Sequence, residues 1–393
     1  ETGAEAYADA VATYLALGVS RTADYCNALC TWNNARDTVA HLFIRQAIPM
    51  AWDYIESNIF SDSSGNFFGQ LKWIIKALQR VPALAKGEAR QVSALNRKYS
   101  HFVISADPPY YDNIEYSDLS DFFYVWLRRS LGGIHSSIVA TMLSPKAEEL
   151  VANPYRHNGK QGAEKFFVDG FNSVFHRIQQ NGIDVEAPMT IYYAYKQQDN
   201  EASGISSTGW HTLLDGLIQA GWEITATWPM RSERKGRMLS ISTNALASSI
   251  VLACRPRPES APTVMRRSFT SALKNELPGA LRTLMQGAIA PVDLAQAAIG
   301  PGISVFSRYA RVREANGSDM SVKDALQLIN ATLDEVLGEQ EADFDPDTRF
   351  AVRWYRQYGW AADSSGIADQ LARSSDTSIV ALERGEIFEA KGG

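Results

Sequence analysis

The middle of the chain alternates between short apolar strands and amphipathic helices, and this alternation constrains the fold more than any other feature. Strand signals are short runs rich in β-branched and aromatic residues, whereas helix signals repeat apolar residues at helical spacing. Such alternation is typical of an α/β sheet covered by helices. No helix signal separates the last two strands, so we expect them to pair antiparallel at an edge of the sheet. The predicted strands cover 101–106, 188–196, 222–230 and 248–256, and the predicted helices cover 117–131, 162–182 and 207–221.

Helical patterns flank this α/β segment on both sides. Residues 3–80 are largely apolar at helical spacing, and residues 321–340 are strongly periodic. A proline-rich and charged stretch over 255–262 predicts a linker. The sequence therefore predicts three parts, which are a helical, insertion-like region over 1–98, an α/β part over 99–256 and a mainly helical region over 257–393.

Composition limits the compartment and the kinds of partner. The formal net charge is −6, so a surface that binds nucleic acid must be a local one. No apolar run reaches the length of a membrane span, and we see no secretion signal, so we expect a cytoplasmic protein. Only three cysteines occur, which fits a reducing compartment. Cys26 and Cys30 lie four residues apart without a second ligand pair nearby in the sequence, so we expect core residues and no metal site.

The segment ISADPPYYDNIEY, residues 104–116, ends the first predicted strand with an acid, two prolines and a tyrosine. In α/β sheets, ligands bind beyond the carboxyl ends of the strands. Asp107 offers a carboxylate acceptor there, and Pro108 and Pro109 offer rigid carbonyl acceptors because proline lacks an N–H group. Tyr110 adds a flat surface for stacking. A strand-ending turn is the alternative, since Asp-Pro and Pro-Pro are common in loops.

Two acceptors beside a stacking ring suit a base that carries an exocyclic amine. The lone pair of such an amine is delocalised into the ring, so the nitrogen is a poor nucleophile. Accepting both N–H hydrogens, one on Asp107 and one on a proline carbonyl, favours a pyramidal nitrogen that can attack a carbon electrophile. Tyr110 would hold the base after it leaves the duplex stack, and the fixed acceptors would stabilise the charge that develops.

Residues after the motif and after the third predicted strand are candidates for contacting the base, the donor or the nucleic acid. The segment WPMRSERKGR, residues 228–237, is basic and suits phosphate contacts, with an aromatic ring to flank a flipped base. A plain loop role is about equally supported for both groups. The candidates are Tyr111, Asn113, Trp228, Arg231, Lys235 and Arg237.

The DPPY motif at a strand end resembles the catalytic motif of amino-methyltransferases, which methylate adenine N6 or cytosine N4 from S-adenosylmethionine. In that family Asp-Pro-Pro-Tyr is most typical of adenine enzymes and Ser-Pro-Pro-Tyr of cytosine enzymes. Four longer runs are similar to a group of large prokaryotic adenine-specific DNA methylases with a helical insertion, often found beside phage-defence genes. These runs are ADYCNALCTWNNARDT, FIRQAIPMAWDYIESNIFSDSSG, DPPYYDNIEYSDLSDFFYVWLRRSL and TNALASSIVLACRPR. The resemblance implies a site-specific DNA adenine-N6 methyltransferase with a Rossmann-like sheet and with Asp107, Pro108, Pro109 and Tyr110 as catalytic residues.

The donor-binding turn of that family is not found in this chain. Such enzymes bind S-adenosylmethionine with a Phe-x-Gly-x-Gly-like turn after their first strand. The nearest glycine pattern, IGPGIS at 299–304, follows a helix-like segment and so fails the strand–turn–helix requirement. We therefore expect a partial methyltransferase sheet, the C-terminal part of such an enzyme, which an upstream segment or partner chain completes.

Two other functions stay open. One is a non-catalytic module that binds DNA or a partner within a defence complex. The other keeps the chemistry and changes the substrate to cytosine N4 or to an RNA base. All four motif residues are present, which favours a working site over a decayed one.

Overall fold

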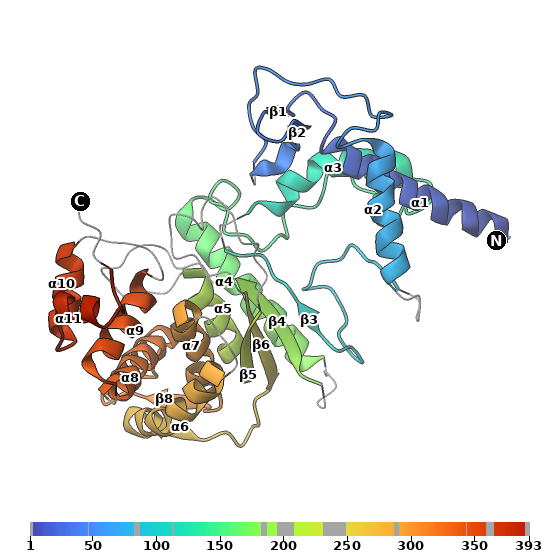
Figure 1. Ribbon diagram of the computed structural model, residues 1–393. Coiled ribbons are helices and arrows are strands. Elements are labelled where there is room, and N and C mark those ends of the chain that lie inside the picture. The colour runs from blue at the N-terminus through green and yellow to red at the C-terminus, as the bar shows by residue number, and fades with distance from the viewer. Residues whose placement is uncertain are drawn as a thin grey trace. The chain divides into compact units, whose positions relative to one another are not determined.

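The computed structural model of the protein divides the chain into two compact units (Figure 1). Unit 1 comprises Glu1–Arg97 and Tyr111–Phe167, and unit 2 comprises Lys98–Tyr110 and Val168–Gly393. The residues that the structure describes are 3–45, 47–81, 87–111, 114–181, 187–194, 208–230, 249–286, 291–342, 344–358 and 365–389.

Unit 1 contains the helices α1 (Gly3–Ala23), α2 (Phe67–Arg80) and α3 (Tyr116–Leu131). Helix α1 packs against both α2 and α3. A Cβ atom added to Gly18 of α1 would lie 2.6 Å from Cδ2 of Leu71, so the absence of a side chain at Gly18 lets α1 and α2 approach closely. The predicted helix over 117–131 is confirmed as α3.

The helical pattern predicted over 3–80 is wrong for most of the segment between α1 and α2. The structure has a small antiparallel hairpin there, with strands β1 (Trp32–Asn33) and β2 (Thr38–Val39), followed by the short 3₁₀ helix η1 (Leu42–Ile44). The Asn33 side chain accepts a hydrogen bond from the backbone N–H of Ala35, and Asp37 has a φ angle of 47°. Turn chemistry of this kind competes with helix formation, and the apolar spacing did not reveal it.

Unit 2 contains a four-stranded mixed sheet in the order β3-β4-β6-β5 (Figure 1). Its strands are β3 (Ser105–Ala106), β4 (Met189–Ala194), β5 (Trp222–Met230) and β6 (Ser249–Pro256). Strands β3 and β4 are parallel, and β6 is antiparallel to both of its neighbours. The mixed α/β class is therefore confirmed, and so is the antiparallel pairing of the last two predicted strands, with β5 at the edge.

The first predicted strand, 101–106, is shorter than expected. Only Ser105 and Ala106 form a ladder, and the preceding contact is a 2.9 Å hydrogen bond from the N–H of Thr190 to the carbonyl of Ile104. His101 has a φ angle of 65°, a left-handed conformation that is incompatible with an extended strand. Within the described sheet β3 pairs on one side only, with β4, which begins at Met189.

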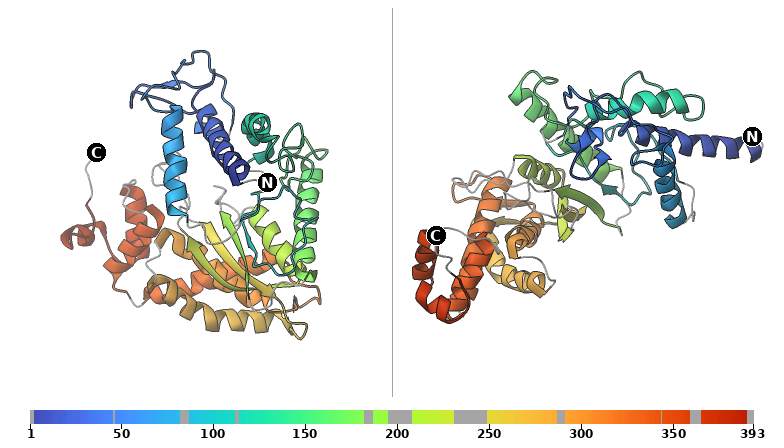
Figure 2. Two further views of the ribbon diagram at one scale, coloured as in Figure 1. Left: turned by 90° about the vertical axis from the view of Figure 1, so that its right-hand side faces the viewer. Right: turned by 45° about the horizontal axis from the view of Figure 1, so that its top comes forward.

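Unit 2 also contains helices that lie between and after the sheet strands in the sequence. Helix α4 (Lys160–Gln180) begins in unit 1 and continues into unit 2, and α5 (Thr208–Gln219) precedes β5. Helices α6 (Arg266–Gln286), α7 (Pro291–Ser307) and α8 (Val322–Ala342) pack against one another, and α7 packs against β5 (Figure 2). Strands β7 (Thr263–Met265) and β8 (Arg311–Arg313) form a separate parallel pair. No helix within the described ranges is both long enough and apolar enough to cross a membrane.

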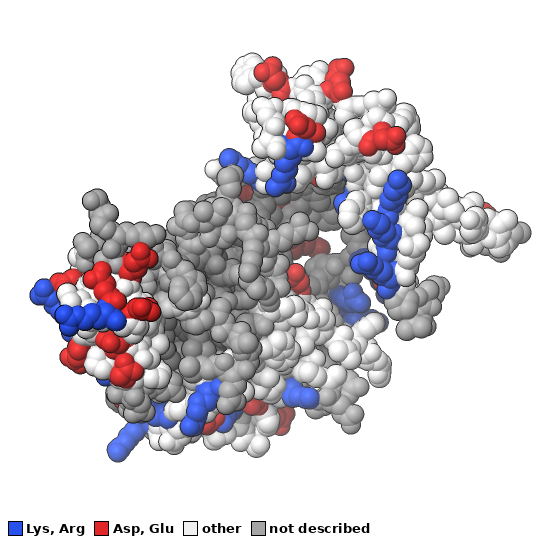
Figure 3. Space-filling view, viewed as in Figure 1, with Lys and Arg blue, Asp and Glu red and all other residues white. Residues whose placement is uncertain are grey.

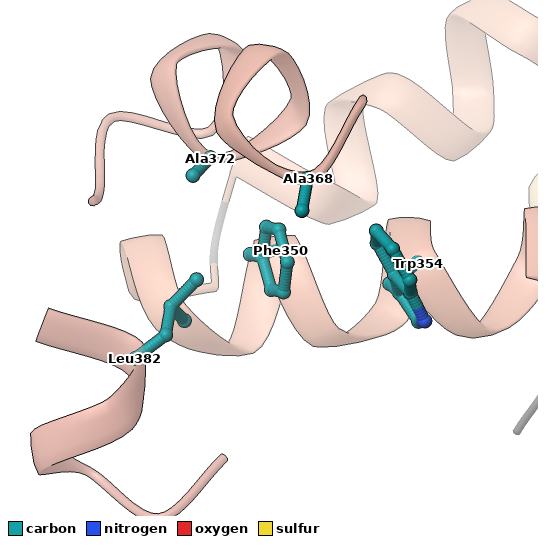
Figure 4. Packing of buried hydrophobic residues seen from close by; sticks show 5 residues of the cluster. All are labelled: Phe350, Trp354, Ala368, Ala372 and Leu382. Atoms are coloured by element: carbon teal, nitrogen blue, oxygen red, sulfur yellow. The ribbon is translucent and has the colours of Figure 1, made fainter. Parts of the chain in front are cut away.

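The C-terminal end of unit 2 carries its own small core. Helices α9 (Pro346–Tyr358), α10 (Ser365–Ser374) and α11 (Ile379–Arg384) enclose a cluster of buried apolar side chains (Figure 4). Asp345 caps α9 by accepting hydrogen bonds from the N–H and hydroxyl groups of Thr348, and Ser378 caps α11. The buried cluster consists of Phe350, Trp354, Ala368, Ala372 and Leu382.

Candidate functional site

The short strand β3 ends directly before the DPPY motif and places it at the carboxyl edge of the sheet. Ala106 lies opposite Ile191 of β4, and Asp107 follows without a further ladder partner. Pro108 and Pro109 cannot donate to a ladder, so the motif itself explains why the strand stops. The Asp107 side chain is exposed, whereas Pro108, Pro109 and Tyr110 are half-buried.

Tyr110 is held by a chain of aromatic rings that the sequence analysis missed. The ring of Tyr110 meets the ring of Tyr193 edge-on, with centroids 4.9 Å apart. Tyr193 on β4 is in turn 5.7 Å from the ring of Trp210 on α5, and both of these side chains are buried. The aromatic residues of the predicted strand 188–196 were the available signal. The contact with Tyr110 depends on the parallel pairing of β3 with β4, which no local pattern reveals.

Tyr110 also contacts the acid of the motif. Its hydroxyl donates a hydrogen bond of 3.0 Å to Oδ1 of Asp107. The bond joins residues three apart in the sequence, across two prolines whose rings fix their φ angles. The arrangement therefore combines an accessible carboxylate with an aromatic ring that packs against buried aromatic side chains.

Trp228 lies near the carboxyl end of β5, and so at the same carboxyl edge of the sheet as Asp107, but the two residues are not neighbours. Strands β3 and β5 are separated by three strand spacings, about 14 Å. Trp228 lies opposite Val251, which lies opposite Tyr192, so these side chains share one face of the sheet. Tyr193, which supports Tyr110, points to the other face. Trp228 is 43% exposed and so is accessible at this edge.

The remaining candidates fall outside this cluster of residues. Tyr111 belongs to unit 1, where its ring packs edge-on against Phe167 and its carbonyl accepts a hydrogen bond from the N–H of Ala152. Four candidates lie outside the described residues, so the structure gives no geometry for them. These are Asn113, Arg231, Lys235 and Arg237.

The glycine pattern at 299–304 is a packing feature of α7. A Cβ atom on Gly300 would lie 1.7 Å from Oγ1 of Thr227 on β5, and one on Gly302 would lie 2.4 Å from Cγ2 of Ile329 on α8. The two glycines let the helix approach the strand on one side and α8 on the other. They do not form a glycine turn between a strand and a helix, which is the element that would hold the adenosyl group of S-adenosylmethionine. The pattern therefore does not fit the donor.

The described residues form no cluster of three or more potential metal ligands. Cys30 is buried, and its thiol lies 3.4 Å from the carbonyl oxygen of Asp24. Cys26 is exposed, which corrects the expectation that both cysteines are core residues. Burial raises the pKa of the Cys30 thiol, and it raises that of Cys254 strongly.

Comparison with known proteins identifies one short region. Residues 345–393 match the family model of a domain of unknown function, DUF8807. The match begins at Asp345, the residue that caps α9, and so covers the small C-terminal core. No curated protein and no solved structure matches the chain significantly.

Proposed function

We propose that residues 107–110 form the amine-binding half of an S-adenosylmethionine-dependent DNA methyltransferase that acts on the N6 amine of a flipped adenine. The observation that carries the proposal is an exposed carboxylate at the carboxyl end of β3, hydrogen-bonded to a tyrosine whose ring packs edge-on against the buried Tyr193. The resemblance of the DPPY run to adenine-specific enzymes supports adenine over cytosine.

The sheet topology also supports a binding site at the carboxyl ends of the strands. Strands β3, β4 and β5 run in one direction, so their carboxyl ends lie together at the edge that Asp107 follows. Ligands of open α/β sheets bind at that edge. Our proposal takes this sheet as part of a Rossmann-like methyltransferase sheet, with the rest of it supplied by an upstream segment or a partner chain.

In this proposal the motif residues bind and position the adenine amine. Asp107 accepts one hydrogen of the adenine amine and a proline carbonyl accepts the other, which frees the nitrogen lone pair for an electrophile. Tyr110 stacks on the base and replaces the neighbours that the base loses when it leaves the duplex. The phenol of Tyr110 also orients the Asp107 carboxylate before the base arrives, so the acceptors need little rearrangement during the reaction.

The donor supplies an electrophilic methyl group on sulfur. The described residues do not provide a turn that fits it, so we assign it no contact in this chain. The proposal places donor binding on the completing segment and amine activation on this chain.

The test compares variants of the motif in the full chain, co-expressed with the segment encoded directly upstream. Asp107→Ala should lower the rate of methyl transfer to DNA about a hundredfold or more, because it removes one transition-state acceptor. Tyr110→Phe should keep most of the activity, since the stacking ring stays, whereas Tyr110→Ala should lose it. Asp334→Ala, at an exposed position of α8, is the matched control and should change nothing.

Folding is checked by circular dichroism for each variant. Turnover of Asp107→Ala near that of the wild type, with folding intact, would refute the assignment. Equal activity of Tyr110→Ala and Tyr110→Phe would show that the aromatic ring at position 110 has no role in the reaction.

A further inference from the structure

Helix α2 of unit 1 is anchored only at its beginning. Asn66 caps it by accepting a hydrogen bond of 2.7 Å from the N–H of Gly69. Phe67 and Leu71 pack against Gly18 of α1. Beyond Ile74 every residue of the helix, 75–80, is exposed, and α2 and α1 diverge in this region (Figure 1).

The exposed side of α2 carries a row of basic residues bordered by aromatic rings. Lys72, Lys76 and Arg80 recur every four residues, so successive charges lie about 6 Å apart along the axis and turn only about 40° around it. Phe68 begins the same row, and Trp73 lies next to it, with Nζ of Lys76 at 4.7 Å from the centroid of its ring. The two aromatic side chains are 57% and 59% exposed.

The three charges of this row are not neutralised locally. Helix α2 contains no acidic residue, and none of its three cations forms an ion pair with another described residue. Residues 66–97 contain six basic residues and one acid, a local net charge of +5 in a chain of net charge −6. Figure 3 shows the Lys and Arg side chains gathered along this helix.

We propose that the row Phe68, Lys72, Lys76 and Arg80, together with Trp73, binds the sugar–phosphate backbone of DNA. Regularly spaced, unpaired cations on a projecting helix match a polyanion whose charges repeat at short intervals. Exposed aromatic rings beside cations are suited to sugars and bases of the same strand. The inference rests on charge and exposure in unit 1 and stands without the proposed methyl transfer.

A lipid surface is the competing partner for a basic amphipathic helix. A helix that lies in a membrane interface needs a free apolar face opposite its cations. In the first half of α2 that face is covered, since Phe67 and Leu71 pack on α1. Ile75 and Leu78 in the second half are exposed, so vesicles are included as a second probe.

The experiment measures binding of the full chain to a labelled DNA duplex of mixed sequence by fluorescence anisotropy, without donor, over a range of salt concentrations. The triple variant Lys72→Gln, Lys76→Gln, Arg80→Gln should reduce the slope of log K against log salt by about 2.7, because each lost phosphate contact contributes about 0.9. The wild type should therefore lose about 40-fold more affinity than the variant between 50 and 200 mM salt, roughly a fourfold change in concentration.

Two further variants separate local charge from net charge and from folding. The control Arg36→Gln, Arg282→Gln, Lys323→Gln removes three exposed cations elsewhere and should keep the wild-type slope. The charge-conserving variant Lys72→Arg, Lys76→Arg, Arg80→Lys should also keep it. The readout is DNA binding without donor and does not depend on residues 107–110, so failure of the methyltransferase proposal leaves this result unaffected.

The proposal is overturned if the triple variant keeps the wild-type slope, if the control loses as much as the triple variant, or if the wild type does not bind the duplex at 50 mM salt. Binding to vesicles that contain an anionic phospholipid, lost in the triple variant while DNA binding is kept, would assign the row to a lipid surface instead.

Discussion

Gly300→Ala is expected to destabilise unit 2 although it replaces a helical glycine by the best helix former. The added Cβ would lie 1.7 Å from Oγ1 and 2.5 Å from Cβ of Thr227. The hydroxyl could rotate away, but Cβ is fixed to the backbone of β5, so strand and helix must separate. Overpacking of this kind costs about 1–3 kcal/mol, and the upper end applies here. The gain in helix propensity is about 1 kcal/mol, which leaves a net loss of about 2 kcal/mol.

The matched control is Gly279→Ala on α6. Gly279 is exposed and has no atom within 4 Å of an added Cβ, so the same substitution should stabilise the protein by up to about 1 kcal/mol. Urea unfolding monitored by circular dichroism measures both changes in stability, and the slope m is compared between the variants. Equal stability of Gly300→Ala and the wild type would refute the packing argument. A loss of S-adenosylmethionine binding by the chain together with its upstream segment, without a loss of stability, would assign this glycine pattern to a donor site.

Most elements of the α/β part follow from local pattern, because periodicity and stop signals agree there. Strand β5 occurs at the predicted residues, and α5 ends before Gly221, which has a φ angle of 82°. The hairpin between α1 and α2 could not be predicted, since turns formed by Asn33 and Asp37 override an apolar spacing that is compatible with helix.

The candidate site, like the fold, could be predicted only in part from the sequence. A carboxylate after a predicted strand could be placed at a sheet edge from the sequence alone. The support of Tyr110 by Tyr193 and Trp210 could not, because it joins segments more than eighty residues apart through strand pairing. The basic row of α2 was hidden for a different reason. Its periodicity is visible in the sequence, but the exposure of Trp73 and the absence of local ion pairs within the described residues are tertiary facts.

Three further predictions follow from the described contacts. Partial burial raises the pKa of the Asp121 carboxyl, but hydrogen bonds from Lys146 and Ser144 outweigh it and hold that pKa below its usual value. This contact therefore stabilises unit 1 above about pH 4 and is lost as the pH falls through the lowered pKa. Asp121→Asn should cost less than about 1 kcal/mol at pH 7, and the cost should shrink as the pH falls below about 4. No cost at pH 7, or a cost that does not shrink on acidification, would contradict this. With a thiol reagent at pH 8, Cys26 should react quickly, whereas Cys30 and Cys254 should react only after unfolding, and fast labelling of two thiols in the folded chain would show that the burial is wrong. The isolated chain should bind S-adenosylmethionine weakly or not at all in calorimetry, and tight stoichiometric binding would mean that it holds a donor site.

The identity of the product tests the central claim most directly. Duplex DNA and RNA are incubated together with the chain, its upstream segment and donor carrying a deuterated methyl group, and the nucleosides of each are then analysed by mass spectrometry. We predict labelled N6-methyladenine, formed by the wild type and reduced about a hundredfold or more by Asp107→Ala. Labelled N4-methylcytosine, label found only in RNA, or equal N6-methyladenine from the Asp107→Ala variant would contradict the account.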